Sequence, residues 1–262
     1  MTHVDGRAWV EQLRGELPRH AALVDALLDR LEPDQRFRAF ELQCSLARGA
    51  GDELSDLDVG LWIADAAWEE TVAELPALVR DLEPTVDVLV AELRDAPYVF
   101  AQYGSGLQLD ALAQPASQAR GRVSNAVILF DRDELLRDPY EPREFRADDA
   151  ALTEWRFRGW LALANLEKYL RRGSIWEAQE QLQEARGHLL RLHAAREGVP
   201  YPGFGLTSLL DSGAPLPDRL EETNAGFDAG DVRRAARVLA ALLDDYDPPP
   251  LADWVRRRLD QR

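Results

Sequence analysis

The sequence is short of cysteine and of long apolar runs. Cys44 is the only cysteine among 262 residues, which excludes an internal disulfide and favours a reducing compartment. No stretch of about 18 uncharged apolar residues occurs, so no membrane span is expected. The charged N-terminus lacks the apolar core of a signal peptide. We therefore predict a cytoplasmic protein with no membrane partner.

Positive charge is also scarce. The chain has 31 basic and 47 acidic residues, for a formal net charge of −16. This balance leaves no basic footprint for a nucleic acid, so no nucleic-acid partner is expected. An acidic surface does suit a cationic small substrate. Lys168 is the only lysine, and the other 30 basic residues are arginines.

Apolar periodicity divides the chain into a mixed half and a helical half. Helical and strand patterns alternate up to about residue 132, and helical patterns follow from residue 150. We predict an α+β fold, with an N-terminal mixed-sheet domain over 1–145 and an all-helical C-terminal bundle over 146–262. The expected strands are 36–46, 56–63, 85–93, a hairpin over 98–114, and 125–132. The expected helices are 5–31 broken at Pro18, 66–83, long helices within 150–198, 206–211, 218–225, 231–245 and 250–260.

The strand 56–63 carries two acids on one face. Its apolar residues from Leu57 to Ile63 occupy every second position, as a buried face requires. Asp56 and Asp58 project side by side from the opposite face, where two carboxylates repel each other. Their oxygens suit a hard divalent cation such as Mg²⁺, so this pair is a candidate metal site.

A glycine-rich loop, SLARGAGD, precedes the two acids. Ser45, Gly49 and Gly51 place backbone amides where phosphate oxygens can approach without side-chain obstruction. Arg48 adds a cation. A loop of this kind directly before paired acids predicts a site for a phosphate-bearing substrate and its metal ion.

The stretch CSLARGAGDELSDLDVGL resembles the nucleotidyltransferase signature of the DNA polymerase beta superfamily, in which Gly-Ser precedes Asp-x-Asp by about ten residues. Ser45 falls on the serine, and Asp56 and Asp58 fall on the metal-binding pair. Arg48-Gly49 matches an Arg-Gly that is common in the small-molecule branch. Cys44 stands where the signature has glycine: either its side chain crowds the triphosphate or the loop tolerates it.

The helical half narrows the resemblance. Residues 154–192 and 219–246 are similar to the last helices of two-domain lincosamide nucleotidyltransferases and their aminoglycoside-adenylylating relatives. The resemblance implies Mg²⁺-dependent transfer of a nucleoside monophosphate, AMP from ATP, to a hydroxyl of a small cationic acceptor. An aminoglycoside or lincosamide acceptor would make the protein an antibiotic-resistance enzyme. The implied nucleotide-binding residues are Ser45, Arg48, Gly49 and Lys168, although Lys168 suits a solvated helix position equally well.

Two residues compete for the third carboxylate of the site. Asp110 and Asp87 both lie in expected strands after the acid pair. In the family this acid lies beside the Asp-x-Asp strand, and in the lincosamide enzymes it acts as the general base. The order of strands favours Asp110 as catalytic base and metal ligand with Asp56 and Asp58, and Asp87 is the alternative.

Two other functions remain open at this stage. The chain could nucleotidylate a protein hydroxyl, as antitoxin-like relatives do, or it could be a non-catalytic nucleotide-binding regulatory protein. Cys44 favours the second alternative, because it departs from the signature. No exposed apolar stripe in the sequence argues for an oligomer.

Overall fold

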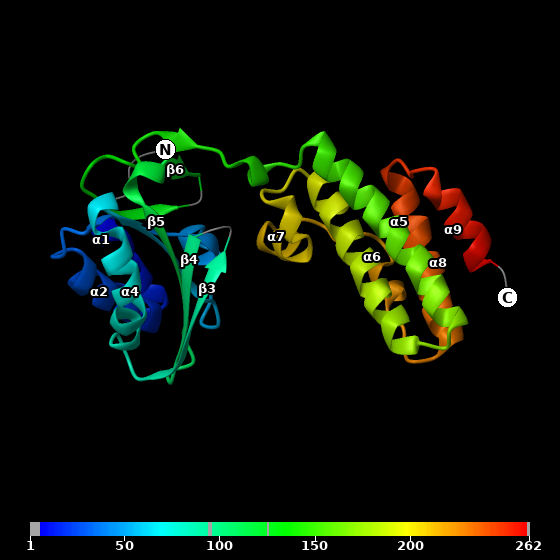
Figure 1. The fold of residues 1–262 in the computed structure, drawn as a ribbon, viewed down its shortest axis with the longest axis horizontal. Coiled ribbons are helices and arrows are strands. Elements are labelled where there is room, and N and C mark those ends of the chain that lie inside the picture. Colours follow the sequence, from blue (N-terminus) through cyan, green and yellow to red (C-terminus); the bar gives the residue numbers. More distant parts are fainter. Residues whose placement is uncertain (1–5, 94–95, 125, 261–262) are drawn as a thin grey trace. The chain divides into compact units, whose positions relative to one another are not determined.

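The computed structural model describes residues 6–93, 96–124 and 126–260. Its internal contacts divide the chain into two compact units, Met1–Glu141 and Pro142–Arg262, each with its own hydrophobic core (Figure 1). The first unit combines helices with strands, and the described part of the second unit is helical. The predicted α+β class is therefore confirmed.

A mixed sheet of six strands forms the centre of the first unit, in the order β3–β4–β5–β2–β1–β7. Only β2 and β5 pair in parallel within this sheet, as far as its described residues go. A second, short pair joins β6 to β8. The strands are β1 (Phe37–Leu42), β2 (Leu57–Ile63), β3 (Thr85–Leu93), β4 (Ala96–Tyr103), β5 (Gln108–Pro115), β6 (Arg122–Val123), β7 (Val127–Asp131) and β8 (Pro139–Tyr140).

Helices cover one face of this sheet. They are α1 (Gly6–Glu16), α2 (Pro18–Leu31) and α4 (Trp68–Arg80), which lie together on one side of the sheet in Figure 1. Their apolar residues join the buried alternate positions of the strands, such as Leu57, Leu61 and Leu109, in one core. Pro18 begins α2 because proline fits the first helical turn, where no amide donor is needed.

The other face of the sheet is covered only in part. Ala39, Trp62, Ile128 and Leu136 form a small cluster over β1, β2 and β7. No hydrophobic cluster of the described residues extends this cover to the same face of β4 and β5. Asp110, one of the side chains predicted to be functional, lies on this open part, opposite Asp58 on β2.

Several element boundaries differ from the predicted ones. Strand 36–46 ends at Leu42, and the short helix α3 (Cys44–Ala47) replaces its last residues. Strand 56–63 begins at Leu57, so Asp56 lies just before it. Residues 218–225 form only a short 3₁₀ turn, Leu220–Thr223, preceded by Arg219 in the left-handed region. The strand predicted over 125–132 is β7, and residue 125 lies outside the described residues.

The second unit is a helical bundle. Asp148 caps the first of its helices by accepting a hydrogen bond from the Ala151 amide at 2.8 Å, and Trp160 lies in the core of the bundle. No helix of the described residues is long and apolar enough to cross a membrane. The helices are α5 (Asp149–Arg171), α6 (Ile175–Arg196), α7 (Leu206–Asp211), α8 (Ala229–Leu243) and α9 (Leu251–Leu259).

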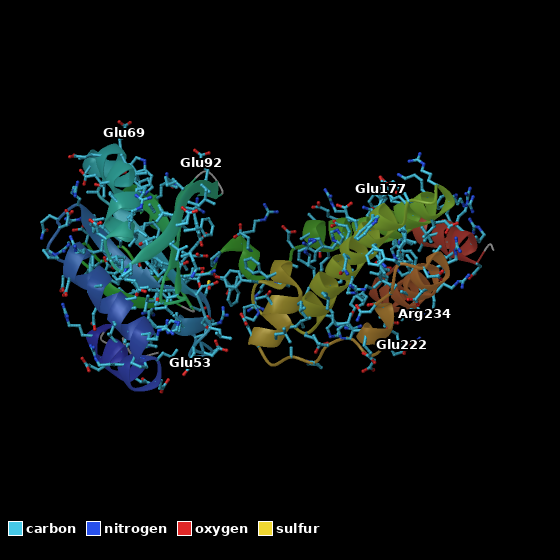
Figure 2. All side chains as sticks on the ribbon, turned by 90° about the horizontal axis from the view of Figure 1, so that it is seen from below. Glu53, Glu69, Glu92, Glu177, Glu222 and Arg234 are labelled. Atoms are coloured by element: carbon cyan, nitrogen blue, oxygen red, sulfur yellow. The ribbon has the colours of Figure 1, made fainter. Side chains whose placement is uncertain are left out.

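Acidic side chains project outward from both units (Figure 2). Glu53, Glu69 and Glu92 are exposed in the first unit, and Glu177 and Glu222 are exposed in the second. Most of the negative charge of the chain is therefore solvated. The exceptions are the few buried acids. A buried acid marks a place where the carboxylate either has a specific partner or lacks a counter-charge.

Candidate functional site

The parallel pairing of β2 with β5 brings two predicted site residues together. Asp58 on β2 stands directly opposite Asp110 on β5 in the strand register. Neighbouring strands lie about 4.8 Å apart, and paired residues point to the same face. Asp56 precedes β2, and its charge acts on both Asp58 and Asp110. The structure therefore places the three predicted carboxylates in one electrostatic group.

Asp87, the alternative third carboxylate, lies elsewhere on the sheet. It faces Gln102 on β4, and β4 lies between its strand and β5. Its side chain is exposed, and one carboxylate oxygen accepts the amide of Val88 at 2.8 Å. Two strand spacings of about 4.8 Å separate β3 from β5, so Asp87 does not join the group around Asp58.

The carboxylates lie in an environment that disfavours their charge. Burial raises the pKa of Asp58 to about 6, and repulsion by Asp110 and Asp56 adds to this effect. Burial also raises the pKa of Asp110, with repulsion by Asp56 as the second cause. The Cys44 thiol, the Arg48 guanidinium and the Tyr98 hydroxyl act in the opposite direction. The site thus has an excess of negative charge that a cation would relieve.

The three carboxylates of Asp56, Asp58 and Asp110 are ligands of the type that a magnesium ion prefers. In the ranges that the structure covers, no group of three His, Cys, Asp or Glu side chains converges closely enough to hold a metal ion as placed. The chemistry of the set nonetheless suits a hard divalent cation, because all three groups are carboxylates. A bound cation also lowers the pKa of its carboxylate neighbours, which would reverse the raised pKa of Asp58.

Cys44 shows why the signature keeps a glycine at this position. Its backbone φ is +56°, in the left-handed region that glycine adopts freely and other residues adopt at a cost of about 1 kcal/mol. The loop therefore needs this conformation, and the cysteine adopts it. Its thiol donates a hydrogen bond to the Asp58 carboxylate. Burial, with the Asp58 charge as a second cause, raises the pKa of this thiol to about 12, so it remains a protonated donor.

Gly49 ends the short helix α3. Its φ is +71°, and its amide donates to the carbonyl of Leu46 at 3.0 Å, while the Ala50 amide donates to the carbonyl of Ser45 at 3.0 Å. These two bonds form a Schellman cap, which requires the left-handed conformation at Gly49. The amide of Gly49 is thus engaged within the chain, and the glycine serves to turn the loop back towards Asp56.

Ser45 and Arg48 lie at the two ends of the same short helix. Ser45 is half-buried in its first turn, and Arg48 is exposed at its last turn. The charge of Arg48 lowers the pKa of both Cys44 and Asp58, which places the guanidinium within electrostatic reach of the site. The Gln43 amide donates to the Asp58 carbonyl at 2.9 Å and so fixes the loop to β2.

Two polar residues of the site were missed from the sequence. Tyr98 on β4 donates its hydroxyl to Asp110 Oδ2 at 3.3 Å. Glu41 on β1 is buried under Gly60, and the lack of a side chain at Gly60 leaves room for it. Burial raises the pKa of Glu41 to about 7, and its Oε2 has no hydrogen-bond partner. Both could have been predicted from their strands, because each is a polar or aromatic residue at a strand position on the same face as Asp58 and Asp110.

Lys168 lies in the second unit, on α5. It is exposed, donates to Asn165 Oδ1 at 3.0 Å and lies 4.6 Å from the centroid of the Tyr169 ring. Both contacts are local to its own helix. Its predicted contact with phosphate stays a prediction.

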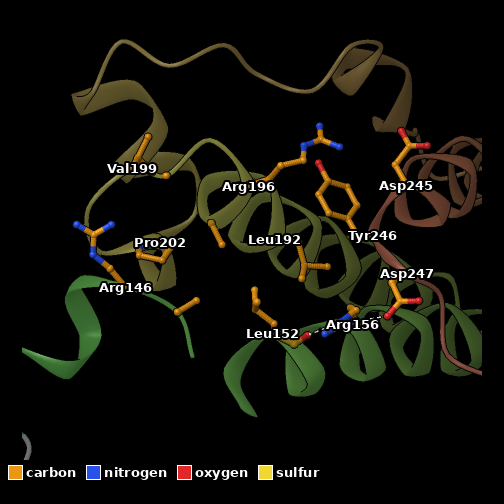
Figure 3. Close-up of a pocket in the computed structure, with 13 residues that line it drawn as sticks. Arg146, Leu152, Arg156, Leu192, Arg196, Val199, Pro202, Asp245, Tyr246 and Asp247 are labelled. Carbon is orange, nitrogen blue, oxygen red and sulfur yellow. Dashed lines mark hydrogen bonds and ion pairs between the residues drawn. The ribbon is translucent and has the colours of Figure 1, made fainter. Parts of the chain in front are cut away.

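A cavity of about 460 Å³ opens in the second unit (Figure 3). Leu152, Leu192 and Val199 are among its apolar lining residues. Its charged groups are largely paired: Arg156 binds Asp247 at 2.5 Å, and Arg196 lies 4.5 Å from the centroid of the Tyr246 ring. None of the site residues predicted from the sequence lines it.

No protein-family model and no curated protein matches the chain. Several solved structures are similar to the chain. An aminoglycoside 6-adenyltransferase from Bacillus subtilis is 18% identical, with 92% of this chain and 91% of that chain covered and a TM-score of 0.38. A nucleotidyltransferase-like protein from Exiguobacterium sibiricum is 14% identical, with 85% and 74% covered and a TM-score of 0.39.

A third similar structure is the CD-NTase CdnG of Bradyrhizobium diazoefficiens in complex with GTP. It is 14% identical, with 92% of this chain and 93% of that chain covered and a TM-score of 0.29. At these identities and TM-scores the matches say nothing of what this chain acts on. Its chemistry has to come from its own side chains.

Proposed function

We propose that this chain is a Mg²⁺-dependent nucleotidyltransferase. It would transfer a nucleoside monophosphate, AMP from ATP, to a hydroxyl of a small molecule and release pyrophosphate. The observation that carries the proposal is the placement of Asp58 opposite Asp110 on parallel strands, with Asp56 in the same electrostatic group. Acids that repel each other on one face of a sheet need a cation, and the phosphates of a nucleotide need the same cation.

The roles of the residues follow from their places. Asp56, Asp58 and Asp110 would hold Mg²⁺, which when bound neutralises charge on the triphosphate. The acceptor oxygen forms a bond to the α-phosphorus, the bond to pyrophosphate breaks, and Asp110 accepts the hydroxyl proton. Tyr98 donates to Asp110 Oδ2, which orients the carboxylate and leaves its other oxygen for the acceptor. The chain's own contribution is therefore positioning and charge placement.

The loop and the second unit complete the proposal. Ser45, Arg48 and the turn made by Gly49 lie in the loop next to Asp58, where a triphosphate would meet its cation. Lys168 would contact the phosphates from the helical unit, and residues 146–262 would select the acceptor. Aminoglycosides and lincosamides are the acceptor classes that the sequence resemblance suggests, and activity on either class would make the enzyme a resistance factor.

Cys44 supports turnover rather than a loss of it. It adopts a left-handed conformation, which a glycine at this position would adopt freely, and its thiol bonds to Asp58. The alternative of a non-catalytic nucleotide-binding protein rested on this residue. Because Cys44 adopts the conformation that the loop needs and bonds to Asp58, we infer that this residue does not favour that alternative.

A pyrophosphate-release assay with Mg·ATP tests the proposal. Hydroxylated acceptors are added one at a time, and wild type is compared with Asp58→Asn and with Asp87→Asn. We expect Asp58→Asn to lose at least a hundredfold in rate, because positioned charge of this kind contributes about 10²–10³. Asp87→Asn is the matched control, an acid on the same face of the same sheet, and should keep its rate within about twofold. Equal rates in both variants would refute the metal assignment.

A further inference from the structure

An apolar strip leads from the carboxylates towards the edge of the sheet. In the strand register Leu89 faces Phe100, Phe100 faces Asp110, and Asp110 faces Asp58. These four residues therefore form one row across β3, β4, β5 and β2. Side chains that face each other in such a row lie about 5 Å apart, so the row is continuous from the acid pair to the edge strand.

The neighbouring row widens this strip. Tyr98 faces Leu112 there, and the Tyr98 and Phe100 ring centroids lie 4.3 Å apart with the ring planes at 44°. Leu89 is 61% exposed, and Tyr98, Phe100 and Leu112 are half-buried. These four residues are the apolar platform. None of them belongs to a hydrophobic cluster of the described residues.

An uncovered sheet face normally carries polar side chains. The platform departs from this rule, because its exposed side chains are apolar. It lies in the row of Asp110 and in the neighbouring row, next to the place where a substrate hydroxyl would have to lie. Exposed apolar groups gathered at one place mark a binding surface, and stacked aromatic rings suit a flat apolar partner.

The charges around the platform argue against a polycationic acceptor. The row on its other side contains Asp87, Gln102 and Gln108. Apart from Asp110, the residues of these three rows on β3, β4 and β5 include one acid, Asp87, and two uncharged amides; the other acids of the rows, Asp58 and Glu41, lie on β2 and β1. A polycation would need several carboxylates along its length.

We propose that the acceptor is a hydroxyl-bearing molecule with a flat apolar face that rests on the apolar platform. This inference rests on the function proposed above and names the substrate class of that site. The apolar face lies on Leu89 and Phe100, and the adjacent hydroxyl reaches Asp110, which takes its proton as the oxygen bonds to the α-phosphorus and pyrophosphate leaves. Aryl glycosides have this chemistry, whereas aminoglycosides do not.

A binding experiment on the full chain tests the platform without turnover. The probes are para-nitrophenyl β-glucoside, methyl β-glucoside and kanamycin, titrated in separate runs by calorimetry. We expect the aryl glucoside to bind at least about tenfold more tightly than the methyl glucoside, as one stacked ring allows. Leu89→Ser and Phe100→Leu should remove this preference.

Val90→Ser is the matched control for Leu89→Ser. Val90 is the next residue of the same strand, is 52% exposed and points to the opposite face. It should keep the full preference for the aryl glucoside. Leu89 lies at the surface, so its variant should fold even where Phe100→Leu does not, and circular dichroism checks both. An aryl preference that is absent in wild type, or that survives in Leu89→Ser, overturns the inference.

The pyrophosphate assay separates this inference from the proposed function. For an acceptor that is turned over, Leu89→Ser should raise the KM for the acceptor at least about fivefold and leave the KM for ATP unchanged. If a polycation is turned over and Leu89→Ser leaves its KM unchanged, the platform does not bind the acceptor. The proposed nucleotidyltransferase activity would still stand. Equal pyrophosphate release by wild type and Asp58→Asn would refute the metal assignment of the proposed function, and the binding experiment would still decide whether the platform binds the aryl group.

Discussion

The two faces of the central sheet use the same strands for opposite purposes. On the helix-covered face, Leu57, Val59 and Leu109 are at most 1% exposed and supply the core. On the open face, the adjacent residues Asp58 and Asp110 repel each other, and burial raises the pKa of both. Residues next to each other in sequence thus stabilise the fold or strain it, according to the face they occupy. Removing a side chain from each face should give effects of opposite sign.

The largest expected effect comes from the open face. Asp110→Asn should lower kcat by about a thousandfold, because the general base is lost. Nucleotide binding should be retained, and the free energy of unfolding at neutral pH should rise, because a carboxyl with a raised pKa destabilises the folded state above its ordinary pKa. Pyrophosphate release, ATP titration and urea unfolding measure the three quantities. Loss of stability would contradict the contrast between the faces.

The neighbouring residue should show the reverse behaviour. Leu109 is fully buried on the helix-covered face. Leu109→Ala should therefore lower the free energy of unfolding by roughly 3 kcal/mol through lost burial and a residual cavity. The rate per folded molecule should stay within about threefold of wild type, because the carboxylates keep their register. Urea unfolding of wild type and Leu109→Ala tests the loss of stability, which should appear as a lower midpoint with an unchanged m value.

Glu41 lies on the open face of the sheet, and its effect on the free energy of unfolding should depend on pH. Its pKa of about 7 in the folded chain lies above its ordinary value of 4.5, so the folded state binds the proton more tightly between these values. Stability should therefore fall as the pH rises from about 4.5 to 7. Glu41→Gln should remove this loss and gain about 3 kcal/mol at pH 8, with almost no gain at pH 4.

Urea unfolding at several pH values measures this difference. The glutamine can still accept the bond from Gln43, which the carboxylate accepts at 2.8 Å in wild type. Parallel pH profiles for the two proteins would show that the buried carboxyl does not titrate in this range.

The smallest effect is expected at Cys44. Cys44→Gly relieves the left-handed strain but adds freedom to the unfolded chain, so stability should change by no more than about 0.5 kcal/mol. Cys44→Val places a branched side chain at φ +56° and should cost about 2 kcal/mol. Turnover should persist in the glycine variant. A valine variant as stable as wild type would show that the loop does not need this conformation.

Sequence patterns predicted the elements whose residues interact locally. The bounds of β3 and α7, 85–93 and 206–211, agree with the predicted ranges. Strand 36–46 was predicted too long, because alternation does not reveal the left-handed turn at Cys44 that ends it. The acid pair and its loop followed from local spacing.

Local patterns did not separate Asp110 from Asp87, and the preference for Asp110 came from the strand order of the family that the sequence resembles. The choice between them depends on β5 inserting between β4 and β2, which is a contact between distant segments. The apolar platform was hidden for the same reason. Phe100 and Leu89 are ordinary strand residues until the register places them in the row of Asp110.

The parallel pairing of β2 with β5 makes the site depend on the register between these two strands. Asp58 and Asp110 share a face because the register sets Leu57 against Leu109 and each later residue against its counterpart. A shift by one residue would turn Asp110 into the core and a leucine or alanine towards Asp58, whereas a shift by two would restore the face. An insertion or deletion that moves β5 past β2 by one residue would therefore take Asp110 off the open face. A two-residue shift would keep the face but move Asp110 about 6.6 Å along the strand from its place opposite Asp58.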